Sequence, residues 1–175
     1  MVFAYYNRLT RAQQRIYQQS DKVTTIPLPQ ARRLHPLVKE LAEALEREDR
    51  RKTEAASQEL VSALTARLKA TPVHVEVLAT RPSRSWGELH GLYTPAEGQK
   101  PARVTVWMRT AQRRRVVAFR TFLRTLLHEV CHHLDYELLG LQETFHTEGF
   151  YRRESSLFHQ LVPNRPQEDS PTTES

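Results

Sequence analysis

Cysteine and long apolar runs are nearly absent from this chain of 175 residues. Its single cysteine, Cys131, excludes an intramolecular disulfide and a zinc ribbon, because each needs more than one thiol. No apolar run approaches the roughly 20 residues that cross a bilayer. The N-terminal segment MVFAYYNRLTRAQQR lacks the apolar core and the small-residue cleavage site of a signal peptide. We therefore expect a cytoplasmic protein that does not contact a membrane.

Basic residues outnumber acidic ones by 26 to 20, which gives a formal net charge of +6. Such a balance attracts phosphate backbones or an acidic partner, but it also describes a well-solvated surface. Much of the charge precedes residue 128, at Arg103, Arg109, Arg113, Arg114, Arg115, Arg120 and Arg124. Aromatic residues do not alternate with these arginines, as a base-stacking surface would require. The run therefore favours an ordinary solvated face, with DNA as the alternative partner.

Periodicity divides the chain into three parts. Residues 1–70 predict an N-terminal arm and a helical region, with helices near 8–19, over 34–45, and from an N-cap at Thr53 to a point before Pro72. Residues 71–161 carry a core of strands and helices. Residues 162–175 are rich in Pro, Ser, Thr and Glu and predict a disordered tail.

Within the core, apolar residues first alternate at every second position, which predicts strands over 73–80, 88–93 and 103–108. These strands follow one another too closely for crossover helices, so we expect a small, mostly antiparallel sheet. Helical spacing returns over 117–139, where Gly140 can end the helix, and again over 147–161. The predicted fold class is α+β, with helices packed on this sheet.

The segment His128-Glu129-Val130-Cys131-His132 is an H-E-x-x-H pattern inside the helix predicted over 117–139. Residues four apart on a helix share one face, so both imidazoles can reach one Zn²⁺ at about 2.0–2.1 Å. Glu129 lies one residue along and can take a proton from a water on that metal. The pattern predicts a zinc centre with Glu129 as general base. Two ordinary histidines on a half-buried helix are the alternative.

A catalytic zinc usually takes three protein ligands and leaves one position for water. His146 and Glu154 both follow the motif helix, and each can reach back to the metal. Asp135 shares a face with the motif histidines, so it either orients an imidazole or is a surface carboxylate. His133 faces about 100° away from His132 and is not expected to bind the metal. Cys131 also points elsewhere on the helix.

These segments resemble the SprT-like (Spartan-related) zinc metallopeptidases. The resemblance rests on the H-E-x-x-H motif, on the segment His146-Thr-Glu-Gly-Phe150-Tyr151, which is similar to H-x-x-x-F-[WY], and on Gly91-Leu-Tyr93 with Arg103-Val-Thr-Val-Trp107. It covers roughly residues 87–161. The resemblance implies a zincin-like fold, zinc held by His128, His132 and His146, and catalysis by Glu129. Spartan relatives cleave proteins crosslinked to DNA, a role that charge alone does not transfer to this chain.

Together these features predict a zinc-dependent metallopeptidase that cleaves a peptide or protein substrate, with water as nucleophile. Tyr151, next to the third histidine segment, is the first candidate for stabilising the transition state, and Tyr93 and His90 are others. One alternative is a non-catalytic metal-binding or DNA-associated module, in which Asp135 or Glu154 closes a four-ligand site. Another is an amidohydrolase of small molecules, which would have a deep enclosed pocket where a peptidase has a groove beside a sheet edge.

Overall fold

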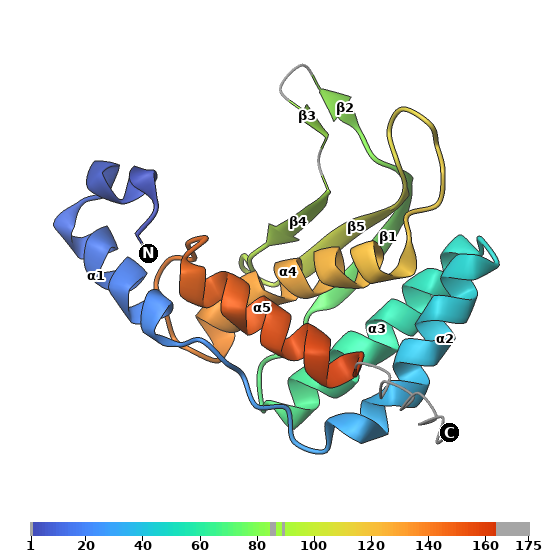
Figure 1. The fold of residues 1–175 in the computed structure, drawn as a ribbon, viewed down its shortest axis with the longest axis horizontal. Helices are drawn as coiled ribbons and strands as arrows, with labels where there is room; N and C mark the ends of the chain where they lie inside the picture. Colours follow the sequence, from blue (N-terminus) through green and yellow to red (C-terminus); the bar gives the residue numbers. More distant parts are fainter. Residues whose placement is uncertain (1, 85–86, 89, 164–175) are drawn as a thin grey trace, which may run out of the picture.

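Most of the helices lie on one side of a small sheet in the computed structural model, which describes residues 2–84, 87–88 and 90–163 (Figure 1). The helices are, in chain order, η1 (Ala4–Arg8), α1 (Arg11–Lys22), η2 (Ala31–Leu34), α2 (His35–Glu46), α3 (Arg50–Arg67), α4 (Phe119–Glu137) and α5 (Glu148–Leu161). The strands are β1 (His74–Thr80), β2 (Ser83–Arg84), β3 (Gly87–Glu88), β4 (Gly91–Thr94) and β5 (Arg103–Arg109). The predicted α+β class is confirmed. The tail predicted over 162–175 lies, beyond residue 163, outside the described residues.

The sheet is mixed, so the prediction of a mostly antiparallel sheet is wrong. Its strand order is β1-β5-β4, with β1 parallel to β5 and β4 antiparallel to β5. In the part of the chain that the structure describes, the short strands β2 and β3 pair with each other alone, and they replace part of the strand predicted over 88–93. A parallel pair needs a crossover of about a dozen residues or more. Here the β2–β3 hairpin and β4 supply that crossover, so no helix is needed between β1 and β5.

Helix α3 begins earlier than predicted, because Asp49 and not Thr53 is its N-cap. The Asp49 carboxylate accepts the backbone N–H of Lys52 at 3.1 Å. Thr53 lies inside the helix, fully buried, and its hydroxyl donates to the Asp49 carbonyl at 2.8 Å. Aspartate and threonine both cap helices well. Asp49 comes earlier in the chain, and α3 begins there.

The outer edge of β1 is covered by side chains from α3, which packs against it. Arg50, Glu54 and Gln58 lie four residues apart and so share one face of α3. Glu54 accepts the Val77 N–H at 2.9 Å, Arg50 donates to the Val77 carbonyl at 2.9 Å, and Gln58 accepts the Val75 N–H at 2.7 Å. An exposed strand edge can pair with other chains, and α3 prevents this at β1. Within the described residues, β4 forms the other edge of the sheet.

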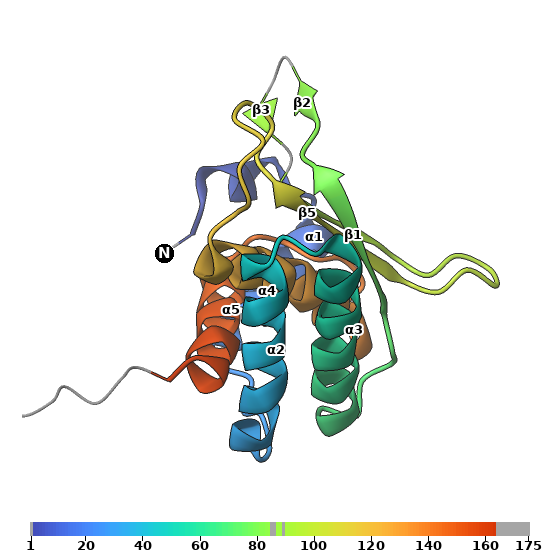
Figure 2. The same cartoon turned by 90° about the vertical axis from the view of Figure 1, so that its right-hand side faces the viewer.

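Helix α4 packs against β4 and β5, and α5 lies beside α4. Figure 2 shows α2 and α3 side by side below the sheet. One apolar core joins these layers, and its fully buried members include Leu41, Leu60, Val77, Val106, Leu126, Phe150 and Phe158. Gly140, at φ 65°, follows α4 as predicted, and Thr147 caps α5 by accepting the Phe150 N–H at 2.9 Å. Among the described residues, no helix has the length and apolarity that a bilayer crossing requires.

A buried arginine connects α1, α4 and α5. Arg153 is 0% exposed, and its guanidinium donates to the Asp135 carboxylate at 3.0 Å and to the Ser20 hydroxyl at 2.9 Å. It also donates to the carbonyls of Ser20 and Val23 at the end of α1. Gly149 allows this close approach, because a Cβ there would lie 2.5 Å from the Asp21 carbonyl oxygen. Helix α1 is thereby fixed to α5.

We expect Arg153→Met to lower the free energy of unfolding by about 3–5 kcal/mol, because Asp135 would stay buried without its cation. Arg152→Met is the matched control, since Arg152 is exposed and pairs with Glu148, one helical turn away. Urea unfolding followed by circular dichroism measures both. Equal midpoints for the two variants would show that the buried pair does not stabilise the fold.

Candidate metal centre

Three histidine rings converge at the surface between α4 and α5. His128 and His132 project from one face of α4, four residues apart, and His146 lies two residues before α5. The three ring centroids lie 4.9–5.0 Å from one another, so the rings form a nearly equilateral triangle. The Nε2 atom of His146 lies 3.1 Å from that of His128 and 3.0 Å from that of His132. The structure thus brings together all three histidines that the sequence proposes as ligands.

The Nδ1 atoms of two of these rings are held by acceptors behind them. Glu154 accepts from His128 Nδ1 at 2.9 Å. Thr144 donates its hydroxyl proton to Asp135 at 2.7 Å, so its oxygen accepts from His132 Nδ1 at 2.8 Å. With both Nδ1 atoms facing these acceptors, the Nε2 atoms are the ring nitrogens that point toward the centre.

This arrangement fits a zinc ion by its donor set. Tetrahedral zinc binds imidazole nitrogens at about 2.0–2.1 Å, which places two such nitrogens about 3.3 Å apart. The printed Nε2 separations of 3.0 and 3.1 Å are close to that spacing. Histidines that bind zinc usually donate their other ring nitrogen to a carboxylate or another acceptor, as His128 and His132 do. The three imidazoles could therefore hold the metal, with a fourth side left open.

Phe150 forms the floor of the centre. Its ring centroid lies 5.0 Å from that of His128, 4.7 Å from that of His132 and 5.3 Å from that of His146. The side chain is fully buried, as expected from its position one helical turn after His146. A rigid apolar ring in contact with all three imidazoles restricts their rotation and excludes water from beneath them.

Glu129 lies on the open side of the centre and is 7% exposed. Gly91 at the start of β4 makes room for it, since a Cβ on Gly91 would lie 2.6 Å from Glu129 Oε1 and 2.8 Å from Cγ. The strand backbone therefore approaches the general-base candidate as closely as a glycine allows. Sequence alone does not indicate this role of Gly91, because the contact is between segments far apart in the chain.

Burial shifts the pKa values of the central groups. It raises the pKa of Glu129 to about 7, with His128 acting in the opposite direction and Glu154 adding to the rise. It lowers the pKa of His132 to about 3, and the neighbouring His128 and His146 lower it further. The pKa of His146 is also lowered, first by burial and then by His128. Neutral imidazoles and a basic carboxylate are the forms that metal binding and proton abstraction need.

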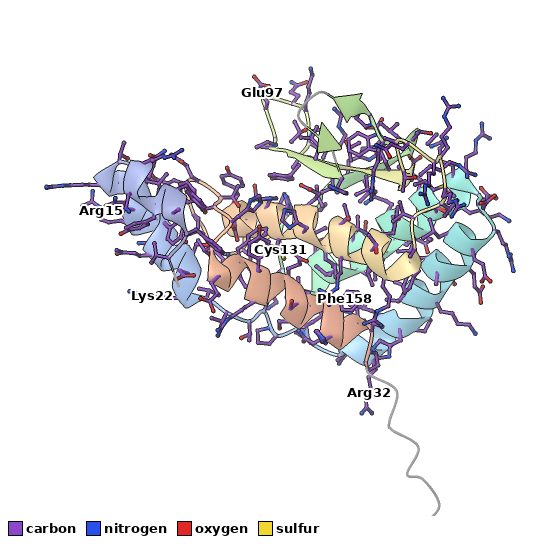
Figure 3. The ribbon with its side chains drawn as sticks, turned by 45° about the horizontal axis from the view of Figure 1, so that its top comes forward. Arg15, Lys22, Arg32, Glu97, Cys131 and Phe158 are labelled. Atoms are coloured by element: carbon purple, nitrogen blue, oxygen red, sulfur yellow. The ribbon has the colours of Figure 1, made fainter. Side chains whose placement is uncertain are left out.

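The residues flanking the motif have separate roles. Asp135 is fully buried and connects Arg153 to Thr144, so it orients His132 through the threonine hydroxyl. His133 is turned away from the centre, where its ring nitrogens meet the Tyr93 hydroxyl at 3.1 Å and the Thr71 carbonyl at 2.6 Å. Cys131 is buried in the core near the middle of α4 (Figure 3).

The N-terminal arm contacts the third histidine. Tyr5 in η1 donates its hydroxyl to the His146 carbonyl at 2.9 Å, and its ring packs edge-on against Tyr17 of α1. The Ser20 and Thr147 hydroxyls lie 3.3 Å apart, which links α1 to the residue that follows His146. The arm therefore fixes the backbone that presents His146.

The three candidates for transition-state stabilisation lie in different positions. His90 is exposed and lines the same cleft as Glu129. Tyr93 also lines the cleft, but its hydroxyl is already paired with His133. Tyr151 is 42% exposed and its ring lies 5.7 Å from that of His146 and 6.1 Å from that of His128, outside the cleft lining. The structure places all three near the histidines, and the catalytic role of each stays a prediction.

The arginine run is not one continuous patch. Arg103 pairs with Glu76 at 3.8 Å and Arg109 with Glu48 at 3.5 Å. Arg120 and Arg124 form a second group, which lies over the Phe158 ring. A third group is exposed in the loop between β5 and α4 and consists of Arg113, Arg114 and Arg115. DNA binding through the exposed loop stays a prediction.

No family model, curated protein or solved structure matches this chain. What the centre can do therefore has to follow from its own side chains.

We expect one zinc per chain, with His146 and not Glu154 as the third ligand. His146→Ala should weaken zinc binding by more than about 100-fold, because it removes a ligand nitrogen. Glu154→Ala should weaken it by about 10–100-fold, the range for a group that orients a ligand. Titration of each untagged variant against a competing chelator measures both losses. A larger loss for Glu154→Ala would reverse the assignment.

Proposed function

We propose that this chain is a zinc-dependent metallopeptidase with a zincin-like arrangement, related to the SprT-like group. The observation that carries the proposal is the convergence of the His128, His132 and His146 Nε2 atoms beside the buried carboxylate of Glu129. When bound, a zinc ion would supply the Lewis acid that makes water acidic and polarises a carbonyl. The remaining steps depend on the residues of this chain.

Glu129 serves as the proton carrier. Its burial favours a carboxylate basic enough to accept a proton from the attacking water near neutral pH. The same carboxyl group then gives that proton to the nitrogen of the scissile bond as the bond breaks. Gly91 leaves the space that the Glu129 side chain occupies in the cleft beside the histidines.

A peptide substrate is favoured over a small molecule by the shape of the surroundings. The cleft has a volume of about 690 Å³ and opens to solvent, and it extends from the histidines along β4 through His90, Gly91, Leu92 and Tyr93 to Pro95. Leu92 on this strand is 46% exposed. An extended peptide can add to such a strand edge through its backbone hydrogen bonds. The outer edge of β1 does not compete, since α3 covers it.

A closed four-ligand site is disfavoured by the partners of the two nearest carboxylates. Glu154 binds His128 Nδ1, and Asp135 binds Arg153 and Thr144. Neither group is placed as a fourth ligand while it makes these contacts. An open fourth position is what a catalytic centre needs for water.

Glu129→Gln should retain zinc and lower peptide cleavage by at least about 10²-fold, because an amide cannot accept the proton. Zinc content by elemental analysis and cleavage of a broad peptide mixture by mass spectrometry test the two halves of this expectation. Full activity in the variant would exclude Glu129 as the general base.

Gly91→Ala tests the placement of Glu129 without changing the carboxylate. The added methyl group should displace the Glu129 side chain and lower the cleavage rate by up to about 10²-fold, since small misplacements carry costs of that size. Zinc affinity should stay close to that of the wild type. Gly98→Asn, in open space at φ +57°, is the matched control and should leave cleavage unchanged. Unchanged cleavage by Gly91→Ala would contradict this placement.

A further inference from the structure

A single guanidinium lies in the wall of the cleft, close to the metal centre. Arg124 is on α4, one helical turn before His128, and therefore on the same face of the helix. It lines the cleft together with Thr125, His128 and Glu129. Its side chain is partly buried, whereas that of Arg120, one turn earlier, is exposed and does not line the cleft.

The guanidinium of Arg124 is held in place by an aromatic ring and not by a carboxylate. Its Cζ lies 3.9 Å from the centroid of Phe158, a fully buried residue of α5 where α5 runs beside α4 (Figure 3). Within the described part of the chain, no aspartate or glutamate lies within ion-pair distance of Arg124. By contrast, Arg103, Arg109 and Arg153 all have such partners. Arg124 keeps its hydrogen-bond donors available while its orientation is restricted.

The carboxylates that share the cleft are directed elsewhere. Glu154 accepts from His128 Nδ1 at 2.9 Å, and Glu129 lies against Gly91 on the open side of the histidines. Glu154 and Glu129 therefore do not neutralise Arg124, and its guanidinium is suited to bind an anion that enters the cleft. Guanidinium and carboxylate match in geometry, because two N–H donors can face two oxygens.

We propose that Arg124 determines substrate specificity by binding a carboxylate of the peptide substrate near the scissile bond. This inference rests on the peptidase function proposed above and adds the class of substrate: peptides with an acidic residue at one fixed position. The same chemistry would bind a C-terminal carboxylate, and the two sources give different cleavage patterns. A phosphate backbone is the less favoured occupant, because Arg124 is inside the cleft beside β4 and not in the exposed loop that holds residues 113–115.

The first experiment maps cleavage sites in a peptide mixture digested by zinc-loaded full-length protein. Wild type should show Asp and Glu enriched at one position relative to the cleaved bond; a terminal carboxylate would instead give cleavage at a constant distance from the C-terminus. Arg124→Gln should lose the enrichment and cleave a Glu-containing peptide about tenfold more slowly, with its Gln-containing counterpart unaffected. Arg124→Glu should shift the preference to Lys and Arg.

Arg120→Gln is the matched control, since Arg120 also lies over Phe158, at 4.9 Å, but outside the cleft. It should retain the acidic preference, which separates a specific contact from the general attraction of a basic protein for anions. Absence of acidic enrichment in wild type would overturn the proposal. Equal losses in Arg124→Gln and Arg120→Gln would also overturn it.

A second experiment is independent of turnover. The Glu129→Gln protein, with and without Arg124→Gln, is immobilised and exposed to two pools of short random peptides that differ only by Glu or Gln at a fixed position. The Glu129→Gln protein should retain the Glu pool more strongly than the Gln pool, and the double variant should lose this difference. That result supports the role of Arg124 even if no peptide is cleaved. In that case only the proposed peptidase function fails. Equal retention of the two pools by the Glu129→Gln protein contradicts the proposal. The proposal is also contradicted if added duplex DNA displaces the Glu pool and the Gln pool to the same extent.

Discussion

Burial of one guanidinium constrains much of this structure. A buried charge needs compensation, and the two terminal nitrogens of Arg153 obtain it from the Asp135 carboxylate and from groups at the end of α1, including Ser20. Asp135 in turn binds Thr144, whose oxygen holds His132 in the tautomer that presents Nε2 to the centre. The packing of three helices and the orientation of one imidazole therefore depend on a single polar network. A change at any member affects both stability and ligand geometry.

The two edges of the sheet differ in what covers them, and of the two, the β4 edge is the one placed to pair with an extended peptide. Polar side chains of α3 occupy the backbone groups of β1, so that edge resists pairing with other chains. The β4 edge instead borders the cleft that contains the histidines and Glu129. Because α4 packs against β4, the strand edge and the motif helix have a fixed separation. At Gly91 the strand comes so close to Glu129 of that helix that a Cβ would not fit.

Local signals in the sequence predict most of the helices and the histidine pair, because helix periodicity and i, i+4 spacing depend on neighbours in the chain. Gly140 is likewise predicted by a local rule for helix ends. Strand pairing is not local, and proximity in sequence wrongly suggested an antiparallel sheet where β1 pairs with distant β5. Thr144 and Arg153 give no signal of their own either, since a threonine in a loop and an arginine on a helix are usually exposed. Their roles arise only when segments far apart meet.

The contacts of α1 have a consequence for how the protein is made. Ser20 and Val23 are bound by Arg153, 133 and 130 residues later in the chain. During synthesis α1 therefore emerges well before its partner on α5. Until α5 is available, the buried end of α1 lacks its partner Arg153, and His146 has not met the pair on α4. Contacts of such long range favour slow folding with late completion. The histidine centre is therefore assembled only after nearly the whole described chain has left the ribosome, so a metal ion cannot be captured by all three imidazoles at an earlier stage.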